Sequence, residues 1–154
     1  MTDARSTTDL EARLARLEDL MEIHQLFVDY GIHLDAGDFD AYAELFADDG
    51  EVLLGPMGRA KGPAEIKAVM TKALDGLQGT SFHIVSSPAV TLDGDRATST
   101  VMWTVVQRDA DGRPTVGMIG RHVDDLVRER GRWRFQRRKG YVDIPSVMTQ
   151  PGSK

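Results

Sequence analysis

Apolar residues in the first part of the chain recur every three or four positions, which is the spacing of one face of an α-helix. The stripe predicts a long helix from Leu10 to Leu34, with Asp9 as its N-cap and one buried face. Gly31 and Gly37 are expected to weaken the far end of this helix. The stripe consists of Leu10, Leu14, Leu17, Met21, Ile23, Leu26, Phe27, Tyr30 and Leu34.

Two shorter helices and a short strand are predicted next. Asp38 can cap a helix that ends in a turn at residues 48–50, and a strand is expected over residues 51–55. Gly62 and Pro63 are suited to open a third helix, because proline fits the first helical turn. The apolar positions of the two helices are Phe39, Tyr42, Leu45 and Phe46, and then Ile66, Val69, Met70 and Leu74.

The second half of the chain is rich in β-branched and aromatic residues divided by turn sequences, the pattern of consecutive antiparallel strands. Helices followed by such a meander indicate an α+β domain in which three N-terminal helices pack on a strongly curved, mainly antiparallel sheet and enclose one pocket. We expect the domain to span residues 10–145, with flexible segments at 1–9 and 146–154. The predicted strands cover residues 82–92, 97–108, 115–130 and 133–142.

Composition excludes several classes of function. The 154 residues hold no cysteine, which rules out disulfides, thiolate metal sites and a cysteine nucleophile. A net charge of −5 makes nucleic acid a poor partner. The basic run at residues 128–139 is explained at least as well by a solvated or interface strand face as by an anionic ligand.

The sequence also lacks the patterns of membrane and cofactor proteins. No stretch approaches the roughly 18 apolar residues of a membrane span, so no membrane partner is expected and the predicted location is the cytoplasm. The histidines do not have a metal-ligand spacing and Gly-x-Gly-x-x-Gly does not occur, so the sequence predicts neither a metal nor another cofactor.

Three residues could form a proton-transfer site if the fold brings them into one pocket. Tyr30 lies on the apolar stripe, Asp35 follows at the helix end, and His83 opens the first long strand. Tyr30 and Asp35 are about 140° apart on an ideal helix, although distortion near Gly31 and Gly37 could turn Asp35 inward. Taken singly, each residue has an ordinary structural explanation as a core aromatic, a helix-end carboxylate or a strand histidine.

Four short motifs carry a family resemblance. They are Tyr-Gly-Ile-His-Leu-Asp-Ala-Gly-Asp-Phe-Asp at 30–40, Leu-Phe-Ala-Asp-Asp at 45–49, Phe-His at 82–83 and Gly-Arg-Trp-Arg-Phe at 131–135. Together they resemble the SnoaL-like branch of the NTF2-like superfamily over residues 14–144. The resemblance implies a cone-shaped fold but not one reaction, because the superfamily holds dehydratases, isomerases, cyclases, epoxide hydrolases and non-catalytic modules.

Within the superfamily, the pattern is most similar to scytalone dehydratase and the bile-acid dehydratases, which use an aspartate-supported histidine together with a tyrosine. The resemblance implies these catalytic roles for Asp35, His83 and Tyr30. The substrate-recognition part differs, since a second histidine of scytalone dehydratase falls on Gln107 and an arginine of the bile-acid enzymes on Asp143. The expected substrate contacts are Leu54, Trp103, Gln107, Met118 and His122.

Such a triad would suit the removal of water from a β-hydroxy carbonyl compound. Histidine, with an ordinary pKa of about 6.5, can take the α-proton and return it to the departing hydroxyl, while tyrosine donates to the developing oxyanion. The expected substrate is a small apolar or polycyclic compound with a carbonyl group. An isomerase or cyclase would begin with the same proton abstraction, and a non-catalytic ligand-binding or interaction module is the third hypothesis.

Apolar residues on both sides of one predicted strand suggest assembly. Val101, Trp103 and Val105 alternate with Thr100, Met102 and Thr104, which suggests that both faces of the sheet are partly buried. We therefore expect a homo-oligomer, and the family resemblance implies that a dimer or a trimer forms through the sheet.

Overall fold

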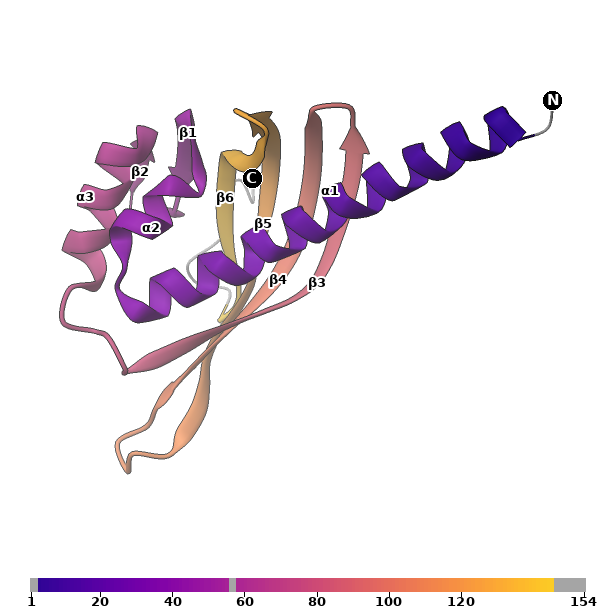
Figure 1. Cartoon of the computed structure of the whole chain (residues 1–154). Helices are drawn as coiled ribbons and strands as arrows, with labels where there is room; N and C mark the ends of the chain where they lie inside the picture. Colours follow the sequence, from indigo (N-terminus) through magenta and orange to yellow (C-terminus); the bar gives the residue numbers. More distant parts are fainter. Residues whose placement is uncertain (1–2, 56–57, 146–154) are drawn as a thin grey trace, which may run out of the picture.

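Three helices pack on a curled sheet in the computed structural model, which describes residues 3–55 and 58–145 (Figure 1). The helices are α1 (Asp3–Ala36), α2 (Phe39–Glu44) and α3 (Gly62–Leu74). Within the described residues, no helix is long and apolar enough to cross a membrane. The predicted α+β class and the packing of N-terminal helices on a mainly antiparallel sheet are confirmed.

The sheet has six strands in the order β2-β1-β6-β5-β4-β3. Neighbouring strands are antiparallel except β1 and β6, which run parallel. The strands are β1 (Phe46–Leu53), β2 (Arg59–Lys61), β3 (Ser81–Asp93), β4 (Arg96–Arg108), β5 (Pro114–Glu129) and β6 (Arg132–Ile144). The four long strands match the predicted ranges closely, because their period-two pattern and their turns are strong local signals.

The first strand differs from its prediction. Residues 48–50 lie within β1 rather than in a turn after α2. Parallel pairing with β6 extends the strand back to Phe46, whose partner is Phe135, and local sequence carries no signal for a pairing so distant in the chain. Gly50 suits this place, since a Cβ atom there would lie 2.7 Å from the Phe135 carbonyl oxygen. The short strand β2 was not predicted, and its three residues are too few to show a period.

Only the second half of the apolar stripe on α1 is buried. Leu10, Leu14 and Leu17 are each 57% exposed and Met21 is 72% exposed. The prediction of one buried face along the whole helix is therefore wrong. Successive residues turn by about 100° around a helix, so the two halves of the stripe emerge on opposite sides. The residues that enter the core are Ile23, Leu26, Phe27, Tyr30 and Leu34.

A cluster of aromatic rings joins α1, α2 and the sheet. The ring of Phe135 on β6 lies 5.3 Å from that of Phe46 and 6.1 Å from that of Phe27, measured between centroids. Tyr42 of α2 is fully buried beside Phe46. Burial of each such side chain stabilises the fold by about 1.5–3 kcal/mol, so this cluster fixes the helices over the sheet.

Gly31 allows α1 to approach β3 closely. The helix continues past this glycine to Ala36, so the expected weakening of the helix end is not observed. A Cβ atom at Gly31 would lie 3.4 Å from the carbonyl oxygen of His83 and 3.6 Å from Val85 Cγ2. The missing side chain therefore sets the spacing between the helix and the edge strand.

We predict that Gly31→Leu lowers the free energy of unfolding by about 1–3 kcal/mol, because a larger side chain forces α1 away from β3. Urea denaturation followed by circular dichroism measures the change. Ala36→Leu, at an exposed position near the helix end, should stay within about 0.5 kcal/mol of the unmodified chain. Equal stability of the two variants would show that the helix and strand do not require this close approach.

Candidate functional site

Asp35 and His83 form a hydrogen-bonded pair where the end of α1 meets β3. His83 Nδ1 lies 2.6 Å from Asp35 Oδ1, and the backbone N–H of His83 donates to Asp35 Oδ2 at 2.9 Å. The side chain of Asp35 is 17% exposed and that of His83 is 21% exposed. A carboxylate beside Nδ1 favours the tautomer with the proton on that nitrogen, which leaves Nε2 as an acceptor.

The pair borders an open depression between α1 and β3. Its six lining residues come from one face of the helix and from the inner face of the strand. Tyr30 is not among them, so the structure joins Asp35 with His83 but does not bring the tyrosine to the same depression. The lining residues are Val28, Gly31, Ile32, Asp35, His83 and Val85.

Tyr30 instead points from α1 into the interior. Its ring centroid lies 5.0 Å from that of Tyr42 and 5.2 Å from that of His122. Tyr30 of α1 and His83 of β3 still lie on the same side of the sheet, the side that the helices cover. Asp35 reaches His83 from an unbroken helix, so no distortion at the glycines is required.

A buried ion pair lies beneath Tyr30. Arg138 Nε and Nη2 each donate to the carboxylate of Asp124 at 2.8 Å, and both side chains are fully buried. Ser99 Oγ donates to the same carboxylate at 2.9 Å. The guanidinium carbon of Arg138 is 4.2 Å from the Tyr30 ring centroid, a cation–π contact.

Sequence reasoning missed this pair. Arg138 belongs to the basic run that was interpreted as a solvated or interface face, and for Arg138 that interpretation is wrong. The signal lay in the alternation of β5, where His122 and Asp124 share the buried parity of Leu126. A charged residue at an apolar parity indicates a buried partner, and strand register places Arg138 directly opposite Asp124.

Four buried polar atoms near Tyr30 have no hydrogen-bond partner within the described part of the chain. They belong to two aromatic rings, an imidazole and the buried guanidinium. An unpaired buried polar group costs about 1–3 kcal/mol, so these atoms distinguish this interior cluster from an ordinary apolar core. The atoms are the Tyr42 hydroxyl oxygen, Trp103 Nε1, His122 Nδ1 and Arg138 Nη1.

Burial also controls the protonation of this interior cluster. The pKa of His122 lies well below its ordinary value, because burial disfavours the imidazolium and the charges of Arg138 and His83 add to that effect. Burial raises the pKa of Tyr30 and of Tyr42 above the ordinary phenol value. Asp124 keeps the pKa of Arg138 raised although burial opposes it. At neutral pH the interior cluster therefore contains two neutral phenols and the neutral imidazole of His122, beside an ion pair whose charges balance.

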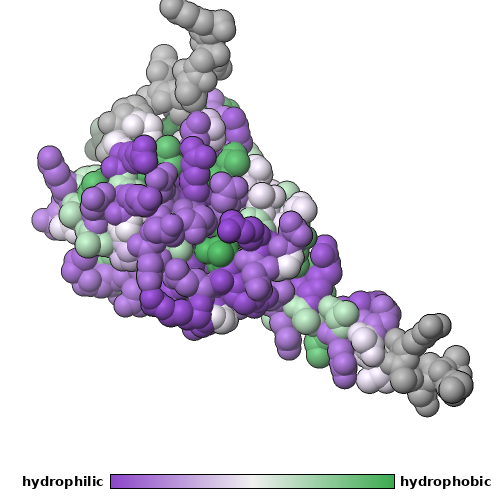
Figure 2. All heavy atoms as spheres, turned by 90° about the horizontal axis from the view of Figure 1, so that it is seen from above, coloured by the Kyte–Doolittle hydropathy of each residue, from purple (hydrophilic) through white to green (hydrophobic). Residues whose placement is uncertain are grey.

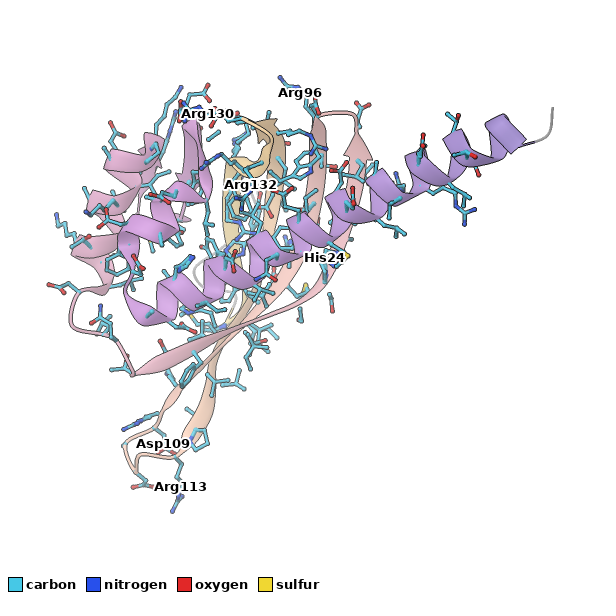
Figure 3. The ribbon with its side chains drawn as sticks, in the orientation of Figure 1. His24, Arg96, Asp109, Arg113, Arg130 and Arg132 are labelled. Carbon is cyan, nitrogen blue, oxygen red and sulfur yellow. The ribbon has the colours of Figure 1, made fainter. Side chains whose placement is uncertain are left out.

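The other residues expected to contact substrate lie in different surroundings. Trp103 and His122 are buried in the interior cluster, their rings 5.8 Å apart, and Met118 is half-buried on β5. Leu54 packs against the edge of the core. Gln107 is exposed and lies over Gly117. Its partner on β3 is Ser81, two residues before His83, so Gln107 lies on the same side of the sheet as His83. Figure 3 labels Asp109 and Arg113 in the loop of the β4–β5 hairpin.

Two further residues considered at the sequence level are also placed. His33 is half-buried, and its carbonyl oxygen accepts the backbone N–H of Asp38. Asp143 accepts a hydrogen bond from Arg121. Over the described ranges 3–55 and 58–145, no group of three or more His, Asp or Glu side chains is arranged to hold a metal ion.

Comparisons with known proteins identify the family. A family model described as a SnoaL-like domain matches residues 15–139. A crystal structure from Novosphingobium aromaticivorans, of an NTF2-like protein with a cystatin-like fold, has a TM-score of 0.81 at 32% identity, covering 96% of this chain and 94% of that one. An uncharacterized protein of Mycobacterium tuberculosis is 31% identical over 81% of this chain and 86% of its own length.

A second Novosphingobium aromaticivorans structure, described as a "Putative Scytalone Dehydratase", has a TM-score of 0.68 at 25% identity, covering 82% of this chain and 85% of that one. The chain therefore belongs to the SnoaL-like domain family and has an NTF2-like fold. This superfamily includes dehydratases, cyclases and isomerases, and SnoaL-like domains bind small-molecule ligands.

We predict that His122 makes stability depend on pH. Its pKa is lowered in the folded state, so between that pKa and the unfolded value of about 6.5 only the unfolded chain binds a proton there. The free energy of unfolding should fall by up to ~1.4 kcal/mol for each pH unit below about 6.5, until pH reaches the folded pKa. Urea titrations between pH 7.5 and pH 5 should show this slope, and His122→Gln should flatten it.

His24→Gln provides a matched control, since His24 lies at the surface of the single chain and not in its core. That variant should keep the slope of the unmodified chain. The same slope in His122→Gln would contradict the assignment of a buried, neutral imidazole.

Proposed function

We propose that the chain is a cofactor-independent lyase of the dehydratase type, which acts by acid-base chemistry on a mostly apolar hydroxy-carbonyl compound. The observation that carries the proposal is the 2.6 Å contact between His83 Nδ1 and Asp35 Oδ1 beside the depression. Membership of a superfamily that contains dehydratases agrees with it.

In this proposal His83 is the general base. Its Nε2 takes the α-proton of the substrate, and the imidazolium that forms is stabilised by the Asp35 carboxylate on the opposite ring nitrogen. The same proton then passes to the departing hydroxyl, which leaves as water. Proton and electrons balance, because the C–H electron pair becomes the new C=C bond as the C–O bond breaks.

Tyr30 is the proposed donor to the developing oxyanion. Its raised pKa keeps the phenol protonated, as a donor must be. Tyr42 and Arg138 contact Tyr30, and we propose that their unpartnered atoms bind further oxygen atoms of the substrate. Because Asp124 balances the charge of Arg138, these unpartnered atoms suit neutral carbonyl or hydroxyl groups of a substrate better than a carboxylate.

The placement of the substrate carbonyl follows from where His83 and Tyr30 lie. His83 lines the depression, whereas Tyr30 contacts His122 deeper in the interior. Trp103 connects them, since it pairs with Val85 of the depression and its ring approaches His122. The α-carbon and the carbonyl oxygen of a substrate are only two bonds apart, so the proposal requires the carbonyl unit to lie between His83 and Tyr30. The remainder of an apolar or polycyclic substrate then extends past Trp103.

We predict that His83→Ala lowers kcat by about 10²–10⁴-fold while the protein stays folded, because the proton acceptor is removed. A set of bicyclic and tricyclic β-hydroxy ketones provides the assay. Elimination creates a conjugated enone, so its ultraviolet absorbance reports turnover and mass spectrometry confirms the loss of one water.

His33→Ala, which removes a half-buried histidine of α1 outside the depression, should keep the rate of the unmodified chain. A substrate that His83→Ala converts at full rate would remove His83 from the role of base. Products of unchanged mass would indicate an isomerase or cyclase, and binding without turnover across the set would indicate a non-catalytic module.

We predict that Tyr30→Phe lowers kcat by about 10²–10³-fold, the effect of losing one donor to an oxyanion. Tyr141→Phe, on β6 beside Arg121, removes a hydroxyl outside the interior cluster and should have no effect on kcat. Steady-state kinetics on the same ketones separate the two variants. Equal kcat values for Tyr30→Phe and the unmodified chain would assign the tyrosine to packing alone.

A further inference from the structure

The first half of α1 carries an apolar face that none of the described residues covers. Leu10, Leu14, Leu17 and Met21 are among the most exposed large apolar residues of the described chain. They lie on the side of the helix opposite Phe27 and Tyr30, which are buried against the sheet. This outer face is therefore not an extension of the core.

The helix also projects beyond the sheet. Residues 7–18 are all exposed, and the described ion pairs between α1 and the strands begin at Asp19, which binds Arg128 of β5. Figure 1 shows this segment extending past β3 and β4, and Figure 2 shows apolar and polar side chains mixed on the projecting arm. This part of α1 is therefore not buried against the described residues of the sheet, and a partner helix could bury its apolar side chains.

The spacing of the outer face identifies the kind of partner. Intervals of four, three and four residues separate Leu10, Leu14, Leu17 and Met21, which is the seven-residue repeat of a two-stranded coiled coil. The next seam positions are His24, labelled in Figure 3, and Val28, which is 47% exposed.

Charges beside the seam select a second copy in parallel orientation. Glu11, Arg13 and Glu18 flank the seam and are exposed. In a parallel in-register pair, Arg13 of one chain lies beside Glu18 of the other, and the reverse pair forms by symmetry. An antiparallel pair would bring glutamates of the two chains together. Arg13 Nη1 lies 3.9 Å from Asp9 Oδ2, and both side chains are solvated. An ion pair of this kind is weak, so Arg13 remains available to pair with Glu18 of a second chain.

We propose that the chain forms a parallel homodimer in which α1 of one copy pairs with α1 of a second copy through Leu10, Leu14, Leu17 and Met21. The same helix face continues to Val28 and Ile32, which line the depression beside His83. Dimerisation therefore sets what lies next to the candidate site. The proposal does not depend on the proposed reaction, since it rests on the exposed seam alone.

Light scattering after size-exclusion chromatography tests the interface with matched variants. Leu14→Glu/Leu17→Glu should convert the dimer to a monomer without loss of the folded body. Phe82→Glu/Val123→Glu, which places charges on the exposed outer face of the sheet, should leave the dimer intact. A monomeric unmodified chain, a trimer, or a dimer lost only in the sheet variant would overturn the proposal.

Cross-linking tests the orientation, because the chain contains no cysteine of its own. Leu10→Cys should give a disulfide-linked dimer on mild oxidation, since equivalent seam positions meet in a parallel pair. Arg16→Cys, outside the seam, should stay unlinked under the same conditions. Reversing one charge with Arg13→Glu should weaken the dimer several-fold, and adding Glu18→Arg should restore it. Equal cross-linking of the two cysteine variants, or no rescue by the second reversal, would contradict the parallel pairing.

Discussion

The contact between Asp35 and His83 ties the end of the longest helix to the edge strand of the sheet. It combines a backbone N–H bond and a ring-nitrogen bond to one carboxylate, so it fixes both the strand and the imidazole. The absence of a side chain at Gly31 lets the helix lie close enough for this contact. The position of α1 over the sheet, and with it the shape of the depression, depends on this junction.

A second constraint acts deeper in the domain, where the Arg138–Asp124 pair is buried without access to solvent. Removal of one partner alone would leave an unpaired charge, at a cost of about 3–5 kcal/mol. The pair is electrically neutral overall, yet the guanidinium still contacts three aromatic rings and lowers the pKa of His122. The interior thereby combines polar hydrogen-bonding groups with apolar rings.

Local patterns predicted most of the fold. The alternation and turns of the four long strands gave β3, β4, β5 and β6, and Gly62 with Pro63 marked the start of α3. Long-range pairing limited the rest. The backward extension of β1 to Phe46 depends on β6, about ninety residues later, and the burial of Arg138 depends on a register shift in β6 that no local pattern reveals.

The candidate site was predicted in part. The Asp35–His83 pair joins residues that family resemblance singled out, whereas periodicity placed Asp35 and Tyr30 about 140° apart around the helix. Helical geometry was correct on that point, and β3 meets the carboxylate on its own side of α1. The outer apolar face of α1 was interpreted as core, because a stripe records apolar spacing but not which neighbour covers it.

Nitrogen-15 NMR of the imidazole rings tests the central junction most directly. When its ring is neutral, we expect His83 to carry its proton on Nδ1, and we expect Asp35→Asn to remove this preference. The exposed His24 should show the same mixture of tautomers in both proteins. A proton on Nε2 of His83, or a spectrum unchanged by Asp35→Asn, would show that Asp35 does not fix the tautomer of His83.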